Sequence, residues 1–225
     1  MAKVALLAGA LGLPQAVAQA CDDQKKEIFV LALKGFADPA WVRAYPHAWV
    51  RLGQAGKIFR LLQQQKCTHL VLAGALRRPA WWNLFPDWEG VKLFWRLNIH
   101  RHGDDSLLRR LTAEFETRGY HVLGADTFLR HLLMPLGPMT KQQPSEQQWQ
   151  RITQLMPRLK EWALADKGQA AVVMRDGSMV FEDAQGTDAL IKNCSGRGGI
   201  LVKIKKPQQD RRFDLPTIGE STIEQ

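Results

Sequence analysis

Short apolar runs alternate with longer segments of helical periodicity over residues 1–133. The runs are rich in Val, Leu, Ile and Phe, as buried strands are, and occupy residues 3–8, 27–33, 69–73 and 120–123. Segments with apolar residues at helical spacing occupy residues 14–24, 54–66 and 104–118, and a short helix is expected over 126–133. Strands that alternate with helices form parallel sheets covered by helices, so residues 1–133 are predicted to form a Rossmann-like α/β domain.

Residues 134–145 break this pattern, because they contain three prolines and show no periodicity. We interpret them as a linker between two domains. A helix is predicted to begin after the linker, since Ser145 and Gln148 have the spacing of a capping box. This helix should extend to about Asp166, and Pro157 should kink or divide it.

The remaining residues favour a small α+β domain over 146–225. Two β-type runs flank the dipeptide Asp176-Gly177, which is a typical hairpin signal. A short helix over 187–193 and a strand over 200–204 are predicted to follow the hairpin. The chain is therefore expected to be a Rossmann-like domain linked to a smaller α+β domain.

The amino-acid composition restricts the possible binding partners more than it restricts the possible folds. A content of 45% apolar residues is that of an ordinary folded protein rather than a disordered or fibrous one. The net charge of +9 favours an anionic partner, which could be nucleic acid, a phosphorylated metabolite or an acidic membrane surface. Three widely spaced cysteines, Cys21, Cys67 and Cys194, fit neither a disulfide framework nor a zinc ribbon, so a reducing cytosol is expected.

The first candidate for ligand binding is the glycine-containing segment 8–14, between the first predicted strand and helix. Backbone N–H groups at such a position can hold a phosphate or pyrophosphate. Gly9 and Gly12 are three residues apart and no third glycine follows, so a simple tight turn explains the segment equally well. A lipoprotein-like leader ending at Cys21 is a weaker alternative, because glycines and Pro14 interrupt its apolar core.

Half of the tryptophans lie in residues 81–95, and cationic residues surround them. They are Trp81, Trp82, Trp88 and Trp95. Aromatic residues interleaved with cations are typical of a membrane interface, an acyl-chain groove or a single-strand nucleic-acid site. Burial between helices explains them as well, and nucleic acid is the weakest option because no known binding motif accompanies them.

Two histidines precede a pair of aspartates, in the order His100, His102, Asp104, Asp105. His-x-His beside aspartates can bind a metal, but neighbouring arginines oppose this. The start of a solvated helix is favoured, since aspartates stabilise helix N-termini.

The densest polar cluster lies near the C-terminus, where Lys203, Lys206 and Arg212 accompany Asp210 and Asp214. Two carboxylates four positions apart can share a divalent cation, and cations beside them can hold phosphate oxygens. Acidic residues after the hairpin, Glu182, Asp183 and Asp188, offer further ligands. Ordinary surface ion pairs are the alternative.

Several motifs stand in a defined order along the chain, namely the segments Ala8–Pro14, Leu33–Pro39, Gly74–Pro79, Gly103–Leu108, Gly168–Val173, Glu182–Asp188 and Gln209–Gly219. Together they resemble the LpxI family of UDP-2,3-diacylglucosamine pyrophosphatases over nearly the whole chain. The resemblance implies magnesium-dependent hydrolysis of the substrate pyrophosphate, giving UMP and 2,3-diacylglucosamine 1-phosphate for lipid A synthesis. The surplus of cations and the tryptophan cluster predict a protein associated peripherally with the cytoplasmic face of the inner membrane, and a homodimer is left open.

The resemblance also implies roles for individual residues. Asp210 and Asp214 are the expected catalytic pair and, together with Asp188, the expected Mg²⁺ ligands. The expected substrate-binding residues are Gly9, Gly12, Leu13, Thr187, Lys203, Lys206 and Arg212.

The chain departs from the family pattern after Gly219, where members usually continue through further helices and strands and only six residues remain here. We therefore expect an incomplete C-terminal domain. A catalytically impaired phospholipid- or nucleotide-binding protein is the alternative function, and an RNA-binding accessory protein, based on charge alone, is a remote one.

Overall fold

The computed structural model describes residues 2–75, 85–97, 104–206, 210, 212, 217–219 and 222–223, with the backbone alone at 104–107. The chain forms two compact units. Unit 1 comprises Met1–Met134 with Asp210–Phe213, and unit 2 comprises Pro135–Gln209 with Asp214–Gln225. A short late segment of the chain therefore belongs to the unit built from its first half.

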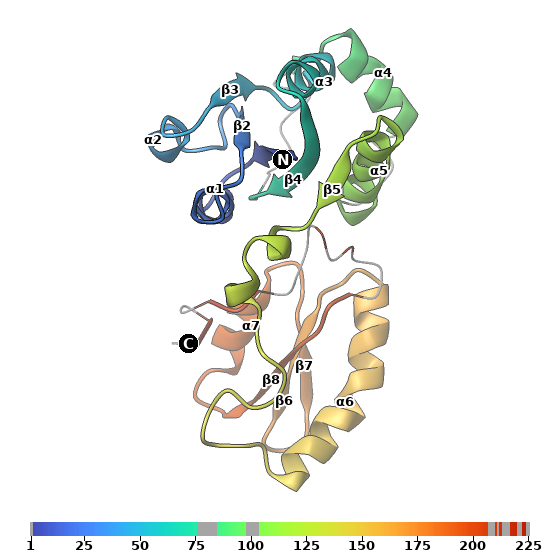
Figure 1. Cartoon of the computed structure of the whole chain (residues 1–225). Coiled ribbons are helices and arrows are strands. Elements are labelled where there is room, and N and C mark those ends of the chain that lie inside the picture. Colours follow the sequence, from blue (N-terminus) through green and yellow to red (C-terminus); the bar gives the residue numbers. More distant parts are fainter. Residues whose placement is uncertain are drawn as a thin grey trace. The chain divides into compact units, whose positions relative to one another are not determined.

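Unit 1 is built on a parallel sheet of five strands in the spatial order β3-β2-β1-β4-β5 (Figure 1). The strands are β1 (Lys3–Ala8), β2 (Ile28–Leu33), β3 (His47–Val50), β4 (Cys67–Ala73) and β5 (His121–Leu123). β1 is central, and its Leu6 is aligned with Val30 of β2 and Val71 of β4. This strand order places a topological switch point between β1 and β4, where ligands of open α/β sheets usually bind.

Helices cover both faces of this sheet. One face packs against α1 (Leu13–Asp23), α2 (Pro39–Val42) and the segment that holds the 3₁₀ turns η3 (Ala125–Thr127) and η4 (Arg130–Leu132). The other face packs against α3 (Ala55–Gln64) and α5 (Asp104–Thr117), while α4 (Trp88–Leu97) packs on α3 and α5. Coverage on both sides explains why β1 and β2 are almost continuous apolar runs.

Unit 2 is a sheet of three antiparallel strands between two helices (Figure 1). The strand order is β7 (Met179–Phe181), β6 (Ala170–Met174), β8 (Gly199–Lys203). One face packs against α6 (Glu146–Leu164) and the other against α7 (Thr187–Cys194). The predicted capping box opens α6, since the Ser145 hydroxyl accepts the N–H of Gln148 and the Gln148 side chain accepts the N–H of Ser145.

The predicted fold class, two linked units of mixed α/β structure, is confirmed. Several local elements differ from the predictions. The segment 126–133, predicted as a short helix, forms two 3₁₀ turns, and α6 continues through Pro157 instead of dividing there. Three elements of the structure were not predicted: α2, β3 and α4. β3 has only four residues, of which three are half-buried, so its pattern is not that of a buried strand.

The core of unit 2 depends on the buried side of α6, and two leucines of this helix make the dependence testable. Leu159 is fully buried against β6, whereas Leu164 is 60% exposed. Leu159→Ala is expected to lower the free energy of unfolding by about 2–5 kcal/mol, because it removes buried contacts and leaves a cavity. Leu164→Ala should change it by less than about 0.5 kcal/mol. Urea unfolding followed by circular dichroism measures both, and equal effects would contradict the packing described.

Candidate functional site

In unit 1, backbone hydrogen bonds join the segments that follow β1 and β4. The N–H of Gly9 donates to the carbonyl of Ala73 at 2.8 Å, and Ala10 and Ala75 exchange a pair of hydrogen bonds at 3.0 Å. Gly74 has a φ of +96°, and a Cβ there would lie 2.6 Å from the Ala10 carbonyl oxygen. These contacts fix the shape of the chain at the switch point of the sheet.

The segment from Gly9 to Leu13 runs from this junction into α1. Gly12 is the N-cap of α1, and no described side chain caps the helix or places an acidic group in its first turn. Leu11 has a φ of +72° and is exposed. The predicted substrate-binding residues Gly9 and Gly12 thus lie in one loop, and Leu13 begins the helix that follows, whose N-terminus suits an anion. Their binding role stays a prediction.

Asp210 and Arg212 form a compact ion pair in unit 1. The Arg212 side chain donates to both oxygens of Asp210, with the shortest contact at 2.6 Å, and also pairs with Glu116 of α5. These hydrogen bonds, first of all those to Asp210, raise the pKa of Arg212 above its ordinary value. The Cα of Arg212 lies next to Gly124, which directly follows β5, so this pair adjoins the carboxyl end of a sheet strand.

The two predicted phosphate-binding lysines belong to unit 2 and already have polar contacts. Lys203 at the end of β8 donates to the carbonyl of Thr217 at 3.0 Å. Lys206 forms an ion pair with Asp166 at 2.7 Å. Each unit by itself therefore holds only part of the predicted cluster, with Asp210 and Arg212 in the first and both lysines in the second.

A buried carboxylate organises the start of α7 in unit 2. The side chain of Glu182 is 6% exposed and accepts the hydroxyl of Thr187 at 2.6 Å. Its second oxygen accepts the N–H groups of Gln169 and Ala170 at 2.6 and 3.0 Å. With both oxygens engaged, Glu182 is a poor candidate for the metal ligand suggested by its sequence position, but it holds the predicted residue Thr187 in a defined orientation.

Asp188 follows Thr187 and lies exposed in the first turn of α7. It lines a shallow groove of about 480 Å³ with Ala189, Lys192 and Ser195. A carboxylate and an ammonium group four positions apart on one helix face can both reach a ligand in this groove. Asp188 thus remains available for the predicted role.

The residues suited to Mg²⁺ are carboxylates, because hard cations prefer oxygen ligands. Asp188 fits this requirement, whereas both oxygens of Asp210 are engaged by Arg212. Within the described ranges no group of three or more His, Cys, Asp or Glu side chains could hold a metal ion. Asp214 lies outside the described residues, as do Trp81, Trp82, His100 and His102, and so do the side chains of Asp104 and Asp105.

The three cysteines are free and buried, which argues against a thiol nucleophile. Burial raises the pKa of the Cys21 thiol to about 11 and also raises that of Cys67. A thiol is a weak nucleophile when its pKa lies well above neutral pH.

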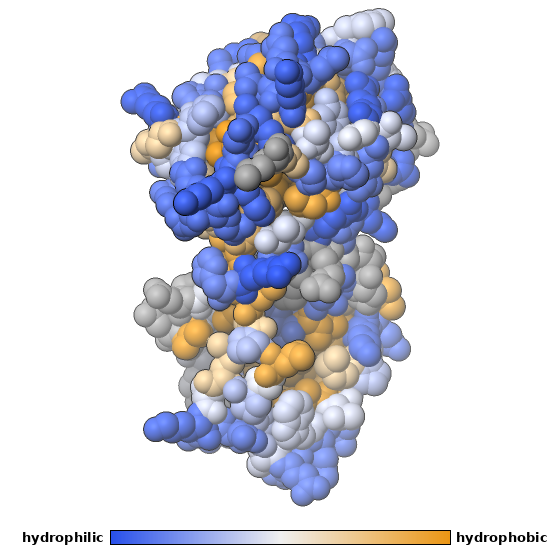
Figure 2. Space-filling model, viewed as in Figure 1, coloured by the Kyte–Doolittle hydropathy of each residue, from blue (hydrophilic) through white to orange (hydrophobic). Residues whose placement is uncertain are grey.

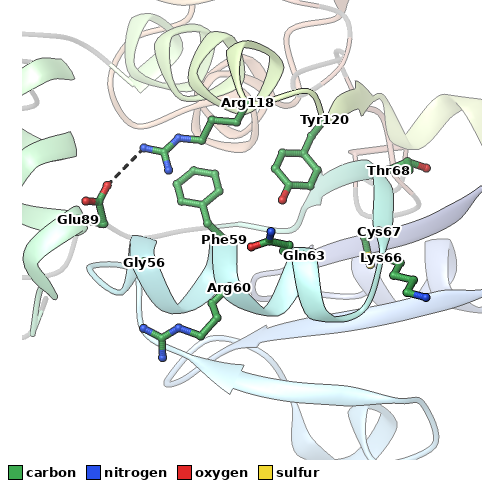
Figure 3. Close-up of a pocket in the computed structure, with 10 residues that line it drawn as sticks. All are labelled: Gly56, Phe59, Arg60, Gln63, Lys66, Cys67, Thr68, Glu89, Arg118 and Tyr120. Atoms are coloured by element: carbon green, nitrogen blue, oxygen red, sulfur yellow. Dashed lines mark hydrogen bonds and ion pairs between the residues drawn. The ribbon is translucent and has the colours of Figure 1, made fainter.

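A groove of about 730 Å³ in unit 1 lies beside α3 at the amino ends of β4 and β5 (Figure 3). Arg118 extends over it, with its guanidinium 3.9 Å from the centre of the Phe59 ring and its nitrogens paired with Glu89 and Glu114. These contacts tie α3, α4 and α5 together. We therefore assign this groove a structural role rather than a catalytic one, since the switch point lies at the opposite ends of the strands.

The sequence did not predict that Glu182 would hold Thr187 in place, and it did not single out Gln169. The side-chain oxygen of Gln169 is buried and accepts no hydrogen bond from the described residues. The only sequence signals were an acidic residue directly after an apolar strand and the resemblance of Gly168–Val173 to a family motif.

Comparison with known proteins places both units in one family. The LpxI N-terminal domain model matches residues 3–132, and the LpxI C-terminal domain model matches residues 135–225. The chain belongs to the LpxI family. It is 36% identical over 235 residues to the UDP-2,3-diacylglucosamine pyrophosphatase LpxI of Caulobacter vibrioides, a match that covers 99% of this chain and 84% of that protein.

Two solved proteins that match the chain are only distantly similar to it. Glycinamide-RNase-transformylase T from Mycobacterium tuberculosis is 14% identical with a TM-score of 0.30, and the match covers 81% of this chain and 44% of that one. The biotin carboxylase domain of a single-chain bacterial carboxylase is 11% identical with a TM-score of 0.31, and this match covers 88% of this chain and 40% of that one. The chain thus spans less than half of either solved protein.

The junction at Gly74 leads to a prediction for the LpxI chain. Gly74→Ala is expected to destabilise unit 1 by at least about 1 kcal/mol, because φ is positive and the new Cβ would contact the carbonyl of Ala10. Gly137→Ala is a matched control, since it also has a positive φ of +94° but open space around it. Urea unfolding of both variants measures the difference, and an equal loss would contradict the close approach.

Proposed function

We propose that this LpxI-family chain hydrolyses the pyrophosphate bond of UDP-2,3-diacylglucosamine, giving UMP and 2,3-diacylglucosamine 1-phosphate for lipid A synthesis. The observation that carries the proposal is the match of both family models together with the 36% identity to a protein named for this activity. The activity is that of a hydrolase acting on a phosphorus anhydride.

The chain's own residues supply two kinds of group for this reaction. The N-terminus of α1, with Gly12 and Leu13, offers backbone N–H groups to an anionic phosphate. Gly9 shapes the same loop, since its own N–H donates to the Ala73 carbonyl. Arg212, Lys203 and Lys206 offer cations for charge on the phosphoryl oxygens. Thr187 and Asp188 at the start of α7 offer oxygens to the polar part of the substrate.

We propose Asp214, with Asp210, as the catalytic carboxylates and Asp214, Asp210 and Asp188 as ligands of a divalent cation such as Mg²⁺. When bound, such a cation neutralises pyrophosphate charge and lowers the pKa of a water molecule. For Asp210, metal binding would compete with its ion pair to Arg212.

We also propose a peripheral contact with the cytoplasmic face of the inner membrane through α4. Within the described part of the chain, no helix is both long and apolar enough to cross a bilayer. Trp88 and Trp95, seven positions apart on α4, are 71% and 67% exposed, and Lys92 lies between them. The face of unit 1 that Figure 2 shows is predominantly hydrophilic. Exposed tryptophans beside a cation suit the interface of an anionic bilayer.

The catalytic proposal predicts that Asp214→Ala abolishes UMP release without unfolding the chain. Loss of an essential carboxylate should lower kcat by at least about 10³-fold. Asp23→Ala, which removes an exposed carboxylate at the end of α1, is the matched control and should leave the rate unchanged. Release of UMP from UDP-2,3-diacylglucosamine is measured by chromatography, with and without EDTA and added Mg²⁺. Near-normal turnover by Asp214→Ala would contradict its assignment, and EDTA-insensitive turnover would contradict the cation.

The membrane proposal predicts that replacing both Trp88 and Trp95 by alanine weakens binding to anionic vesicles at least about tenfold. Each tryptophan loses its interfacial contact, and the effect should disappear for neutral phosphatidylcholine vesicles. Trp149→Ala is a matched control, because Trp149 is similarly exposed on α6 of unit 2. Vesicle flotation measures the binding, and full flotation of the double variant would contradict the role of α4.

A further inference from the structure

The hydrogen bonds around Glu182 fix the direction in which Thr187 donates its proton. Oε1 of Glu182 accepts the hydroxyl of Thr187 at 2.6 Å. A carboxylate hydrogen-bonded in this way only accepts, so the single hydroxyl proton of Thr187 is committed to Glu182. The Thr187 oxygen therefore retains only acceptor capacity for any other partner.

The carboxylate that imposes this direction is held from several sides. Oε2 accepts the N–H groups of Gln169 and Ala170, and the backbone N–H of Glu182 donates to the carbonyl of Ala170 at 2.9 Å. The carbonyl of Glu182 accepts the indole N–H of Trp162 at 2.7 Å. Gly168 makes room for this arrangement, since a Cβ there would lie 2.7 Å from the Glu182 carbonyl oxygen. Glu182 therefore has a fixed position against the start of β6.

Thr187 is the first residue of α7, is only half-buried, and precedes the exposed Asp188. We propose that Glu182 is a positioning residue that makes Thr187 an obligate hydrogen-bond acceptor, so that Thr187 receives an O–H or N–H group of the substrate rather than a phosphate oxygen. This inference rests on the proposed function. A phosphate oxygen carries no proton at neutral pH, so it would face the Thr187 oxygen without a hydrogen bond.

Glu182→Gln tests the inference because it reverses the direction of one hydrogen bond and preserves the shape of the side chain. The amide oxygen can still accept the N–H groups of Gln169 and Ala170, while the amide nitrogen now donates to Thr187. The Thr187 hydroxyl is thereby freed to donate outward. The freed hydroxyl proton would then face the donor group of the substrate. This should lower kcat/KM at least about tenfold, mainly through a higher KM.

Thr187→Val removes the acceptor and should cause a loss of similar size, whereas Thr187→Ser should lose less. The double variant Glu182→Gln with Thr187→Val should be no worse than Thr187→Val alone, because both changes act through one hydroxyl. Additive losses in the double variant, or a normal KM in Glu182→Gln, would overturn the inference. Calorimetric titration with UMP locates the donor. Weaker UMP binding by both variants places it in the nucleotide, and unchanged UMP binding with a raised KM places it in the diacylglucosamine part.

Asp87→Asn is the matched control for loss of a carboxylate that caps backbone N–H groups. Asp87 in unit 1 accepts the N–H groups of Gly56, Lys57 and Gly90 at 2.8–3.1 Å. This variant should keep a normal KM even where its melting temperature falls. A purely structural role for Glu182 would produce the same pattern in Glu182→Gln and would overturn the inference. A wild-type chain that releases no UMP would instead contradict the proposed function.

A measurement on the wild-type chain covers the case in which Glu182→Gln does not fold. The Thr187 hydroxyl proton, held by a carboxylate at 2.6 Å, should exchange slowly and give an NMR signal with contacts to Glu182. Addition of UMP or of substrate should leave this signal in place. Its absence, or its loss when ligand binds, would show that the hydroxyl is not committed to Glu182.

Discussion

Burial of β1 on both faces is the constraint on which the rest of unit 1 depends. Five of its six residues, Val4 to Ala8, are buried, and it pairs with a parallel strand on each side. Parallel neighbours need crossover connections, and these bring helices onto both faces. All strands then end at one edge, where the loops after β1 and β4 bond to each other and Gly124 after β5 meets Arg212. The candidate anion site of unit 1 is a consequence of this geometry.

In unit 2 the corresponding constraint is a single buried carboxylate. A buried charge is costly unless hydrogen bonds compensate it, and Glu182 receives three, from two backbone N–H groups and the Thr187 hydroxyl. These bonds join the start of β6, the residue after β7 and the first turn of α7. Stability and site geometry therefore depend on the same atoms, and a side chain that looked like an exposed ligand in the sequence has a positioning role.

The sequence predicted those parts of the fold that follow from periodicity and local caps. The buried strands, α1, α3, α5 and the capping box at Ser145 follow from patterns that lie within one segment. β3 was missed because its His47 and Trp49 are half-buried at the sheet edge. α4 was missed because the tryptophans of residues 81–95 were interpreted as a candidate binding surface. The pair between Arg212 and Glu116 joins residues far apart in the chain, so only folding reveals it. The pair between Arg212 and Asp210, two positions apart, was open to sequence reasoning.

The two units differ in whether they offer hydrogen-bond donors or hydrogen-bond acceptors at the start of a helix. Unit 1 presents backbone N–H donors at the start of α1, which suit an anion. Unit 2 presents acceptors at the start of α7, namely the proton-committed Thr187 oxygen and the Asp188 carboxylate, which suit hydroxyl and amide donors. A UDP-linked acylated sugar contains both kinds of group, an anionic pyrophosphate and a set of hydroxyl and amide protons. The donors at the start of α1 therefore suit the anionic groups of such a molecule, and the acceptors at the start of α7 suit its hydroxyl and amide protons.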